Sequence, residues 1–167
     1  PKLALSWKNL ANGYVQLGKT QQAEIAYRKS IKLNPNLFNS HFLLGMLLIR
    51  QKKLQEAKQP LRKTIELNPN FFQAHHNLGV VLQELGQLQE AELSTREAIK
   101  LNPDFAEAYL NLGTIFKIHG NLQEAEVSVR KAIELNPDFA EAYFNLSLTE
   151  LLKGNYQSGL DNFEFRF

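Results

Sequence analysis

A three-residue sequence, Leu-Asn-Pro, recurs along the chain at a fixed interval. Its four copies occupy residues 33–35, 67–69, 101–103 and 135–137, so each begins 34 residues after the one before it. A fixed period of this length indicates an architecture in which one supersecondary unit is copied. A single unit of this size cannot bury its own apolar face, so neighbouring copies must stack to cover it. The chain is therefore expected to be a stack of repeats.

Each repeat has the pattern of two helices joined by a turn. A first apolar stripe has the helical spacing i, i+3, i+4, i+7, as in Tyr109, Leu112, Gly113 and Phe116. A glycine, which tolerates a left-handed conformation, is expected to end this helix; it stands at Gly18, Gly86, Gly120 and Gly154. A second helix follows, with alanine at Ala23, Ala57, Ala91 and Ala125. Proline ends it, because the residue before proline avoids helical dihedral angles.

The first helix also has a position reserved for small residues, where the second helix must come close. Ala11, Gly45, Gly79, Gly113 and Ser147 occupy it. A larger side chain there would overpack the contact between the two helices. Asp104 with Glu107, and Asp138 with Glu141, have the N-cap and third-residue spacing that would start the next helix.

These residues resemble the tetratricopeptide repeat family, whose pattern combines a Trp-x2-Leu-Gly-x2-Tyr segment with a later alanine and proline. The matches in the first repeat are Trp7, Leu10, Tyr14, Gly18, Ala23, Tyr27 and Pro35. The resemblance implies an all-α fold, a right-handed superhelical solenoid of antiparallel helix pairs. It covers one array with full repeats at residues 4–37, 38–71, 72–105 and 106–139 and a partial fifth at residues 140–167.

Two residues depart from the family pattern, both in the second repeat. Lys52 replaces the glycine of the turn, and Pro60 lies well inside the second helix. Proline removes a backbone hydrogen bond from a helix and kinks it. We therefore expect this repeat to be locally irregular.

Composition limits the classes of function. The chain has no cysteine, which excludes disulfides, thiolate metal sites and a cysteine nucleophile. A formal net charge of +2 argues against nucleic acid or a membrane surface as the partner. No apolar run is long enough to span a bilayer, and the first residues are too short and polar for a signal peptide. We expect a cytoplasmic fragment of a longer protein.

A narrower resemblance concerns one asparagine position. Arrays of the O-GlcNAc transferase type carry an asparagine just before the leucine of each first helix, and here Asn9, Asn77, Asn111 and Asn145 fill that place. Only Leu43 interrupts the row. The segment from Gly154 to the end of the chain is similar to the end of repeat arrays that lead into a bacterial glycosyltransferase domain. The resemblance implies that the array presents substrates to such a domain.

The asparagine row also has a physical interpretation as a binding surface. At about 100° per residue, Asn111 lies nearly opposite the packing stripe of its helix. A primary amide both donates and accepts hydrogen bonds, so it can bond the backbone of an extended peptide. Each bond would contribute only about 0.5–1.5 kcal/mol. The alternative is that asparagine is simply tolerated on an exposed helix face.

Apolar residues flank this row and are expected to form the rest of the wall. They include Phe42, Met46, His76 and Leu110. Such a wall favours a peptide ligand with hydrophobic side chains. The alternative is that a tightly wound superhelix buries part of this surface against itself.

Chaperone-tail receptors of the same family hold a terminal carboxylate with lysine, asparagine and arginine on successive first helices. Lys8 and Asn12 match the first-repeat part of that clamp. Leu43, Gln73 and Asn77 stand where the remaining clamp residues would be, so the clamp is incomplete.

No catalytic site emerges from the sequence. Residues 13–20 satisfy the expression G-x-x-x-x-G-K-T of a phosphate-binding loop, but Gly13 lies inside an expected helix and no strand precedes it. The histidines show no metal-binding spacing. We therefore expect no enzymatic activity, no catalytic residue, no cofactor and no metal.

The sequence leaves two interpretations of function. The first is a protein–protein interaction module that binds an extended peptide in a concave groove. The second is a structural scaffold that associates with itself through its ends and outer surface. Phe163 and Phe167 near the end of the chain would then be exposed and would favour a homodimer.

Overall fold

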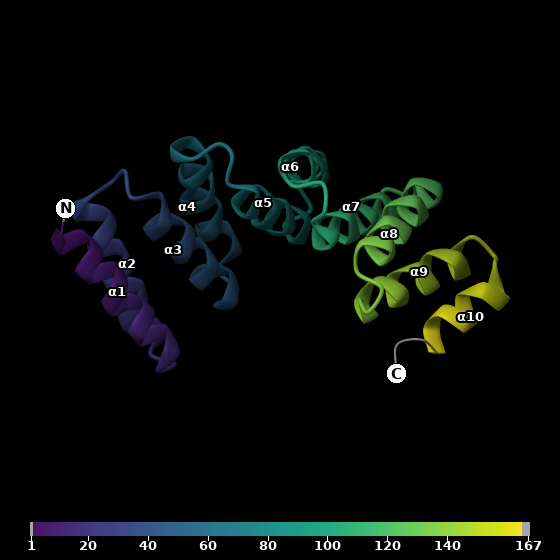
Figure 1. Ribbon diagram of the computed structural model, residues 1–167, viewed down its shortest axis with the longest axis horizontal. Coiled ribbons are helices and arrows are strands. Elements are labelled where there is room, and N and C mark those ends of the chain that lie inside the picture. The colour runs from purple at the N-terminus through teal and green to yellow at the C-terminus, as the bar shows by residue number, and fades with distance from the viewer. Residues whose placement is uncertain (1, 165–167) are drawn as a thin grey trace. The chain divides into compact units, whose positions relative to one another are not determined.

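The computed structural model describes residues 2–164 and contains ten α-helices and no strand within that range (Figure 1). The helices are α1 (Lys2–Gln16), α2 (Thr20–Leu33), α3 (Phe38–Arg50), α4 (Leu54–Leu67), α5 (Phe72–Glu84), α6 (Leu88–Leu101), α7 (Ala106–Ile118), α8 (Leu122–Leu135), α9 (Ala140–Leu152) and α10 (Tyr156–Glu164). Each pair falls within one 34-residue period of the sequence. The expected all-α fold of helix pairs is confirmed.

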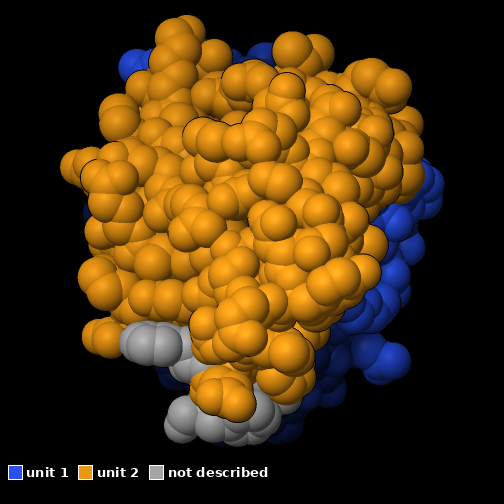
Figure 2. Space-filling model, turned by 90° about the vertical axis from the view of Figure 1, so that its right-hand side faces the viewer, with its two compact units in different colours: residues 1–85 blue, residues 86–167 orange. Residues whose placement is uncertain are grey.

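The chain divides into two compact units, Pro1–Leu85 and Gly86–Phe167 (Figure 2). In the first unit α1 packs on α2 and α3 on α4, and α4 packs in turn on α5. In the second unit α7 packs on α8 and α9 on α10, while α6 packs on α7 and α8 on α9. Every helix thus covers the apolar face of a neighbour in its own unit, as a stack of repeats requires. No described helix is both long and apolar enough to cross a membrane.

The turns between paired helices have the backbone conformation that their sequence predicts. Gly18, Gly86, Gly120 and Gly154 have φ angles of 69°, 73°, 81° and 84°. In the second repeat Lys52 takes the same conformation, with a φ of 59°. α4 runs through Pro60 with 14 residues, the same length as α2, α6 and α8. The expected irregularity of this repeat therefore does not extend to its helix boundaries.

The prediction that Asp104 and Asp138 are N-cap residues is wrong. α7 is preceded by Phe105 and α9 by Phe139, and neither helix has a side-chain cap. The polar side chain that organises the turn before α7 is Asn102, whose Oδ1 accepts a hydrogen bond from the Asp104 backbone N–H at 3.3 Å. Asn34 makes the same kind of bond, accepting at Oδ1 from the Asn36 backbone N–H at 3.1 Å, and asparagine in turns commonly bonds the backbone two residues later.

The alanine row of the second helices is buried, as expected. Ala23, Ala57, Ala91 and Ala125 are all completely buried. On the facing first helices Gly45 lies against Leu61, and Gly113 lies against Ala125 and Val129. The absence of larger side chains at these positions lets the backbones of paired helices approach each other.

Replacing Lys52 by glycine is expected to raise the free energy of unfolding by about 0.5–1 kcal/mol, because a side chain is strained in the left-handed region. Its ion pair with Glu84, at 3.8 Å, is exposed and contributes little. Urea denaturation followed by circular dichroism measures the change. Lys19→Gly is the control, because Lys19 is also exposed beside a turn but has a φ of −83°. An equal gain in both variants would contradict the assignment of strain to Lys52.

Candidate functional site

The two asparagines of the predicted row in the first unit keep unused hydrogen-bonding capacity. Asn9 is exposed and bonds no other described residue. Asn77 is half-buried, and its Nδ2 donates to the Gln73 backbone oxygen at 2.7 Å. That bond fixes the orientation of the amide and leaves its Oδ1 and its second N–H without a partner among the described residues.

The two asparagines of the second unit are engaged more fully. Asn111 is only 8% exposed, and its Nδ2 donates to Thr95 Oγ1 on α6 at 2.8 Å. Asn145 donates from Nδ2 to the Glu141 backbone oxygen at 3.0 Å and accepts at Oδ1 from Lys117 Nζ at 2.7 Å. Asn111 therefore joins two helices, and its role in binding a peptide is restricted to what its small exposed part can reach.

The residues expected to form the apolar wall do not share one environment. Phe42, Met46 and His76 are half-buried, and the Phe42 ring meets the Phe71 ring edge to face at 4.8 Å. Leu110, by contrast, is buried in a core cluster with Val129, Ala132, Ala142 and Leu146. Its place on the wall is corrected, because α7 turns this side chain toward α8 and α9 and away from solvent.

Lys8 and Asn12, the two residues that match a carboxylate clamp, also differ in their environment: Asn12 is hydrogen-bonded within the chain and Lys8 is not ion-paired with a described residue. Asn12 accepts a 2.6 Å hydrogen bond at Oδ1 from the hydroxyl of Tyr27, a buried residue of α2. Burial raises the pKa of Tyr27 further above its ordinary value. Lys8 is half-buried and has no ion pair with a described residue. Asn12 thus binds α1 to α2, and Lys8 alone keeps a free charge.

A largely apolar pocket lies on α7 and α9 in the second unit. Its volume is about 460 Å³, and Lys117, Ile118, Leu148, Leu151 and Leu152 line it. Desolvation lowers the pKa of Lys117, whose hydrogen bond goes to the neutral amide of Asn145. The pocket thus combines four aliphatic side chains with one cation that no carboxylate of the described residues pairs.

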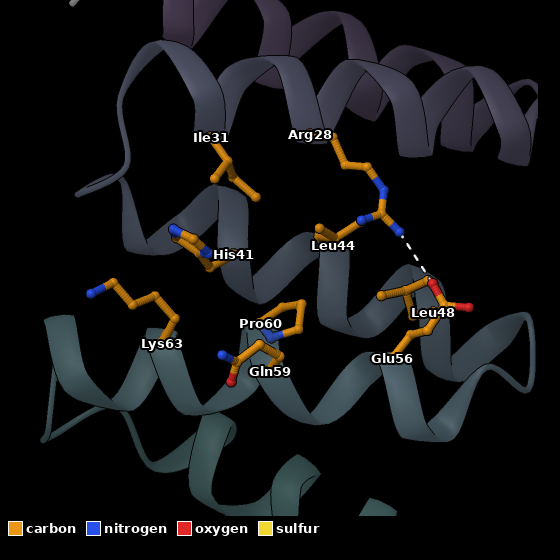
Figure 3. A pocket seen from close by; sticks show the side chains of 9 residues that line it. All are labelled: Arg28, Ile31, His41, Leu44, Leu48, Glu56, Gln59, Pro60 and Lys63. Carbon is orange, nitrogen blue, oxygen red and sulfur yellow. Dashed lines mark hydrogen bonds and ion pairs between the residues drawn. The ribbon is translucent and has the colours of Figure 1, made fainter.

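A larger hollow of about 550 Å³ lies in the first unit among α2, α3 and α4 (Figure 3). Ile31, Leu44, Leu48 and Pro60 give it apolar walls. Its charges are matched within the chain, because Arg28 bonds Glu56 across it at 3.2 Å and Glu24 at 2.8 Å. Burial raises the pKa of Glu24, but hydrogen bonds from Arg28 and Lys53 outweigh burial and leave that pKa lowered.

The C-terminal helix carries exposed apolar side chains. Tyr156 and Leu160 are exposed, and Phe163 is 37% exposed, with its ring 6.1 Å from that of Phe144. Phe167, the second residue expected to mediate self-association, lies outside the described residues. Association of two copies through this surface stays a prediction.

The residues that imitate a phosphate-binding loop have no such loop around them. Gly13 lies inside α1, and Gly18 is in the turn that follows this helix. Within residues 2–164 no group of three or more His, Asp or Glu side chains is placed to hold a metal.

The chain matches models of a protein family and solved structures of other proteins. A family model described as "Tetratricopeptide repeat" matches residues 26–59, 61–92 and 129–160, more than half of the chain, and a second model of that description matches residues 4–37 and 106–139. No curated protein sequence matches the chain significantly.

Solved structures of similar fold cover nearly the whole chain. One described as "MamA 41-end from Desulfovibrio magneticus RS-1" is 20% identical with a TM-score of 0.92, covering 99% of this chain and 94% of its own. A second MamA structure is 24% identical with a TM-score of 0.90, covering 99% and 90%. A structure of YrrB, described as "a TPR protein with an unusual peptide-binding site", is 24% identical with a TM-score of 0.81, covering 98% and 84%. At these identities the likeness shows the shared fold.

Proposed function

Because the chain belongs to the tetratricopeptide repeat family, we propose that it holds an extended segment of a partner protein against the first helices of its repeats. Proteins of this family generally act as non-catalytic interaction modules. In the first unit the binding residues are Asn9 and Asn77, with Phe42, Met46 and His76 beside them. In the second unit they are Asn145 and the exposed part of Asn111.

One observation carries the proposal most directly: Asn77 is oriented by a bond to its own helix and still has an acceptor and a donor to offer. An amide that is held in place loses little conformational freedom when it binds a ligand. It can bond the N–H or C=O of a peptide without selecting a side chain. Half-buried Phe42 and Met46 of the same unit add apolar surface for the side chains of the segment. The description of YrrB as a peptide-binding protein of this fold is consistent with such a use.

A peptide display library panned against the wild-type chain and against an Asn9→Ala/Asn77→Ala variant tests the proposal. We expect peptides that are enriched on the wild type to lose about fivefold to a hundredfold in affinity on the variant, as two lost hydrogen bonds of about 0.5–1.5 kcal/mol each would cause. The control is Asn36→Ala/Asn121→Ala, which removes two exposed asparagines outside the row. Asn111 is left intact, because removing its buried bond to Thr95 would also weaken the fold.

Equal binding to the wild type and to the Asn9→Ala/Asn77→Ala variant would remove the asparagines from the site. No enrichment on either would favour the second candidate, self-association, which the exposed Tyr156 and Leu160 of α10 support. A mass above that of one chain by light scattering would then be expected.

The same surface is proposed to present substrates to a glycosyltransferase domain. This part rests on the asparagine row and on the similarity of the last residues to such arrays, and none of the three solved structures described above is of that kind. The test is to fuse the chain to a glycosyltransferase and to measure sugar transfer to a bound peptide by the wild type and by an Asn77→Ala variant. Equal transfer by the two would contradict this part of the proposal.

A further inference from the structure

The pocket on α7 and α9 has a composition that separates it from ordinary exposed apolar surface. Single exposed aliphatic residues are common on soluble proteins. Here Ile118 and Leu152 are exposed, and they line one pocket of about 460 Å³ together with the partly buried Leu148 and Leu151. A contiguous apolar hollow of this kind indicates a ligand with an apolar group.

The lysine in the same pocket is unusual among the cations of its unit. Lys100 and Lys131 each bond a glutamate of their own helix, at 3.0 Å and 2.7 Å. Lys117 bonds only Asn145, and no carboxylate of the described residues pairs it. An ammonium group removed from water without a counter-charge is unfavourable, and a bound anion would relieve that cost. Its lowered pKa, caused by desolvation, is consistent with this.

Asn145 determines where the free part of the ammonium lies. Its Nδ2 is bonded to the Glu141 backbone oxygen, so its Oδ1 is directed and accepts one N–H of Lys117 at 2.7 Å. An ammonium has three donors, and two are left for a ligand. A carboxylate has several lone pairs that could accept both. The pocket therefore offers an apolar hollow and a fixed cation side by side.

We propose that this pocket binds an extended peptide segment in which an aliphatic residue is followed or preceded, two positions away, by aspartate or glutamate. Alternate residues of an extended chain face the same side, so the aliphatic side chain can fill the pocket while the carboxylate meets Lys117. The inference rests on the proposed function, because it names the kind of segment that the second unit holds. The carboxylate belongs to a side chain, since the proposed segment continues past Asn145 along the wall.

The hollow of the first unit differs from this pocket, because a cation that lines it is already paired with carboxylates of the chain. Arg28 in that hollow is already paired with Glu56 (Figure 3). It is also paired with Glu24. An acidic ligand there would have to displace carboxylates of the chain itself. Of the two hollows, only the α7–α9 pocket has a cation available for an acidic partner.

The test uses a peptide display library whose members are fused at their C-termini, so that only side chains supply carboxylates. It is panned against the wild-type chain, Lys117→Met and Lys131→Met. Methionine keeps the length and apolar stem of lysine and removes its charge. We expect peptides with the aliphatic-x-acidic pattern to be enriched on the wild type and on Lys131→Met and to be lost on Lys117→Met.

The strongest such peptide is then compared in solution with a twin that carries asparagine or glutamine in place of its acidic residue. Either change, in the peptide or at Lys117, is expected to weaken binding about tenfold, as loss of a charge-assisted hydrogen bond does. Both changes together should weaken it little further, because they remove the same contact. Enrichment without an acidic preference, or equal binding of the two peptides, would overturn the inference.

The Asn9→Ala/Asn77→Ala variant separates failure of this inference from failure of the proposed function. If peptides lose affinity on that variant but show no acidic preference, the proposed function stands and the pocket assignment fails. If the acidic preference depends on Lys117 while the asparagine variant binds normally, the pocket is a site and the first-unit asparagines are not. No enriched peptide on the wild type would overturn both.

Discussion

Replacing Arg130 by methionine is expected to lower the free energy of unfolding by about 2–4 kcal/mol, because it leaves a buried carboxylate without its cation. Glu150 on α9 is 1% exposed, and Arg130 donates to its Oε1 at 2.6 Å. Asn162 on α10 donates to its other oxygen at 2.7 Å and would remain, which keeps the loss below that of a fully stripped charge. Urea denaturation followed by circular dichroism measures the change.

Arg96 supplies a matched control at the equivalent position of the preceding repeat. Its side chain is 54% exposed and that of Arg130 is 53% exposed, and each bonds the glutamate four residues earlier at 2.8 Å. Arg96 lies over the Phe116 ring, 5.4 Å from its centre, and has no buried carboxylate to satisfy. Arg96→Met is therefore expected to cost less than about 1 kcal/mol. Equal losses in the two variants would show that the buried pair with Glu150 has no special weight.

Replacing Gly113 by alanine is expected to lower the free energy of unfolding by about 1–3 kcal/mol, because the added methyl group overpacks the contact of α7 with α8. A Cβ at this position would lie 2.5 Å from Val129 Cγ2 and 3.1 Å from the Ala125 backbone oxygen. The side chain of Val129 can turn away, but a backbone oxygen inside α8 can move only if the helix moves. The expected loss includes the gain of up to about 1 kcal/mol that alanine brings to a helix.

Gly13 gives the opposite result for the same substitution. It lies inside α1, and a Cβ there would have no atom within 4 Å. Gly13→Ala is therefore expected to raise the free energy of unfolding by about 0.5–1 kcal/mol. The pair of variants, measured by the same urea denaturation, separates helix propensity from helix contact. A loss in both would mean that the first helices tolerate no side chain at either position.

The helix pairs could be predicted from the sequence because every 34-residue period contains residues that mark where its helices end and pack. Each turn glycine has the positive φ that its position requires, and each alanine of the second helix is buried. Lys52 was expected to disturb its turn but adopts the glycine conformation there. The left-handed conformation costs a residue with a side chain about 1 kcal/mol, and the packing of the two paired helices outweighs that cost.

The candidate site could be predicted only in part, because the periodic pattern says which helix face a residue occupies and not what lies opposite. Asn111 bonds Thr95, which precedes it by 16 residues. Leu61 and Val129 stand at the same spacing before Asn77 and Asn145, and an aliphatic side chain cannot accept a hydrogen bond. Asn111 is thus the buried member of the row, and its side chain bonds a hydroxyl of the preceding helix. The residue 16 positions before each asparagine is the sequence signal that distinguishes Asn111 from Asn77 and Asn145.

The pocket at Lys117 and the buried Glu150 were beyond prediction for a similar reason. Glu150 stands where Tyr14, Leu48, Leu82 and Phe116 stand in the other repeats, so a charge there conflicts with the periodic pattern. It is stabilised by Arg130 and Asn162, which lie 20 residues before it and 12 after it. Such compensation depends on side chains from three helices at once, and no spacing rule within one helix contains it.

The most direct test of the central claim, that the first helices hold a peptide, is a nuclear magnetic resonance titration of the chain with the peptide most enriched by panning. We predict that the side-chain amide signals of Asn9 and Asn77 shift, together with backbone signals of the first helices. Signals of Ile25, Leu93 and Val127, exposed on the second helices, should stay in place. Shifts confined to those three positions or to α10, with the asparagine amides unchanged, would contradict the account.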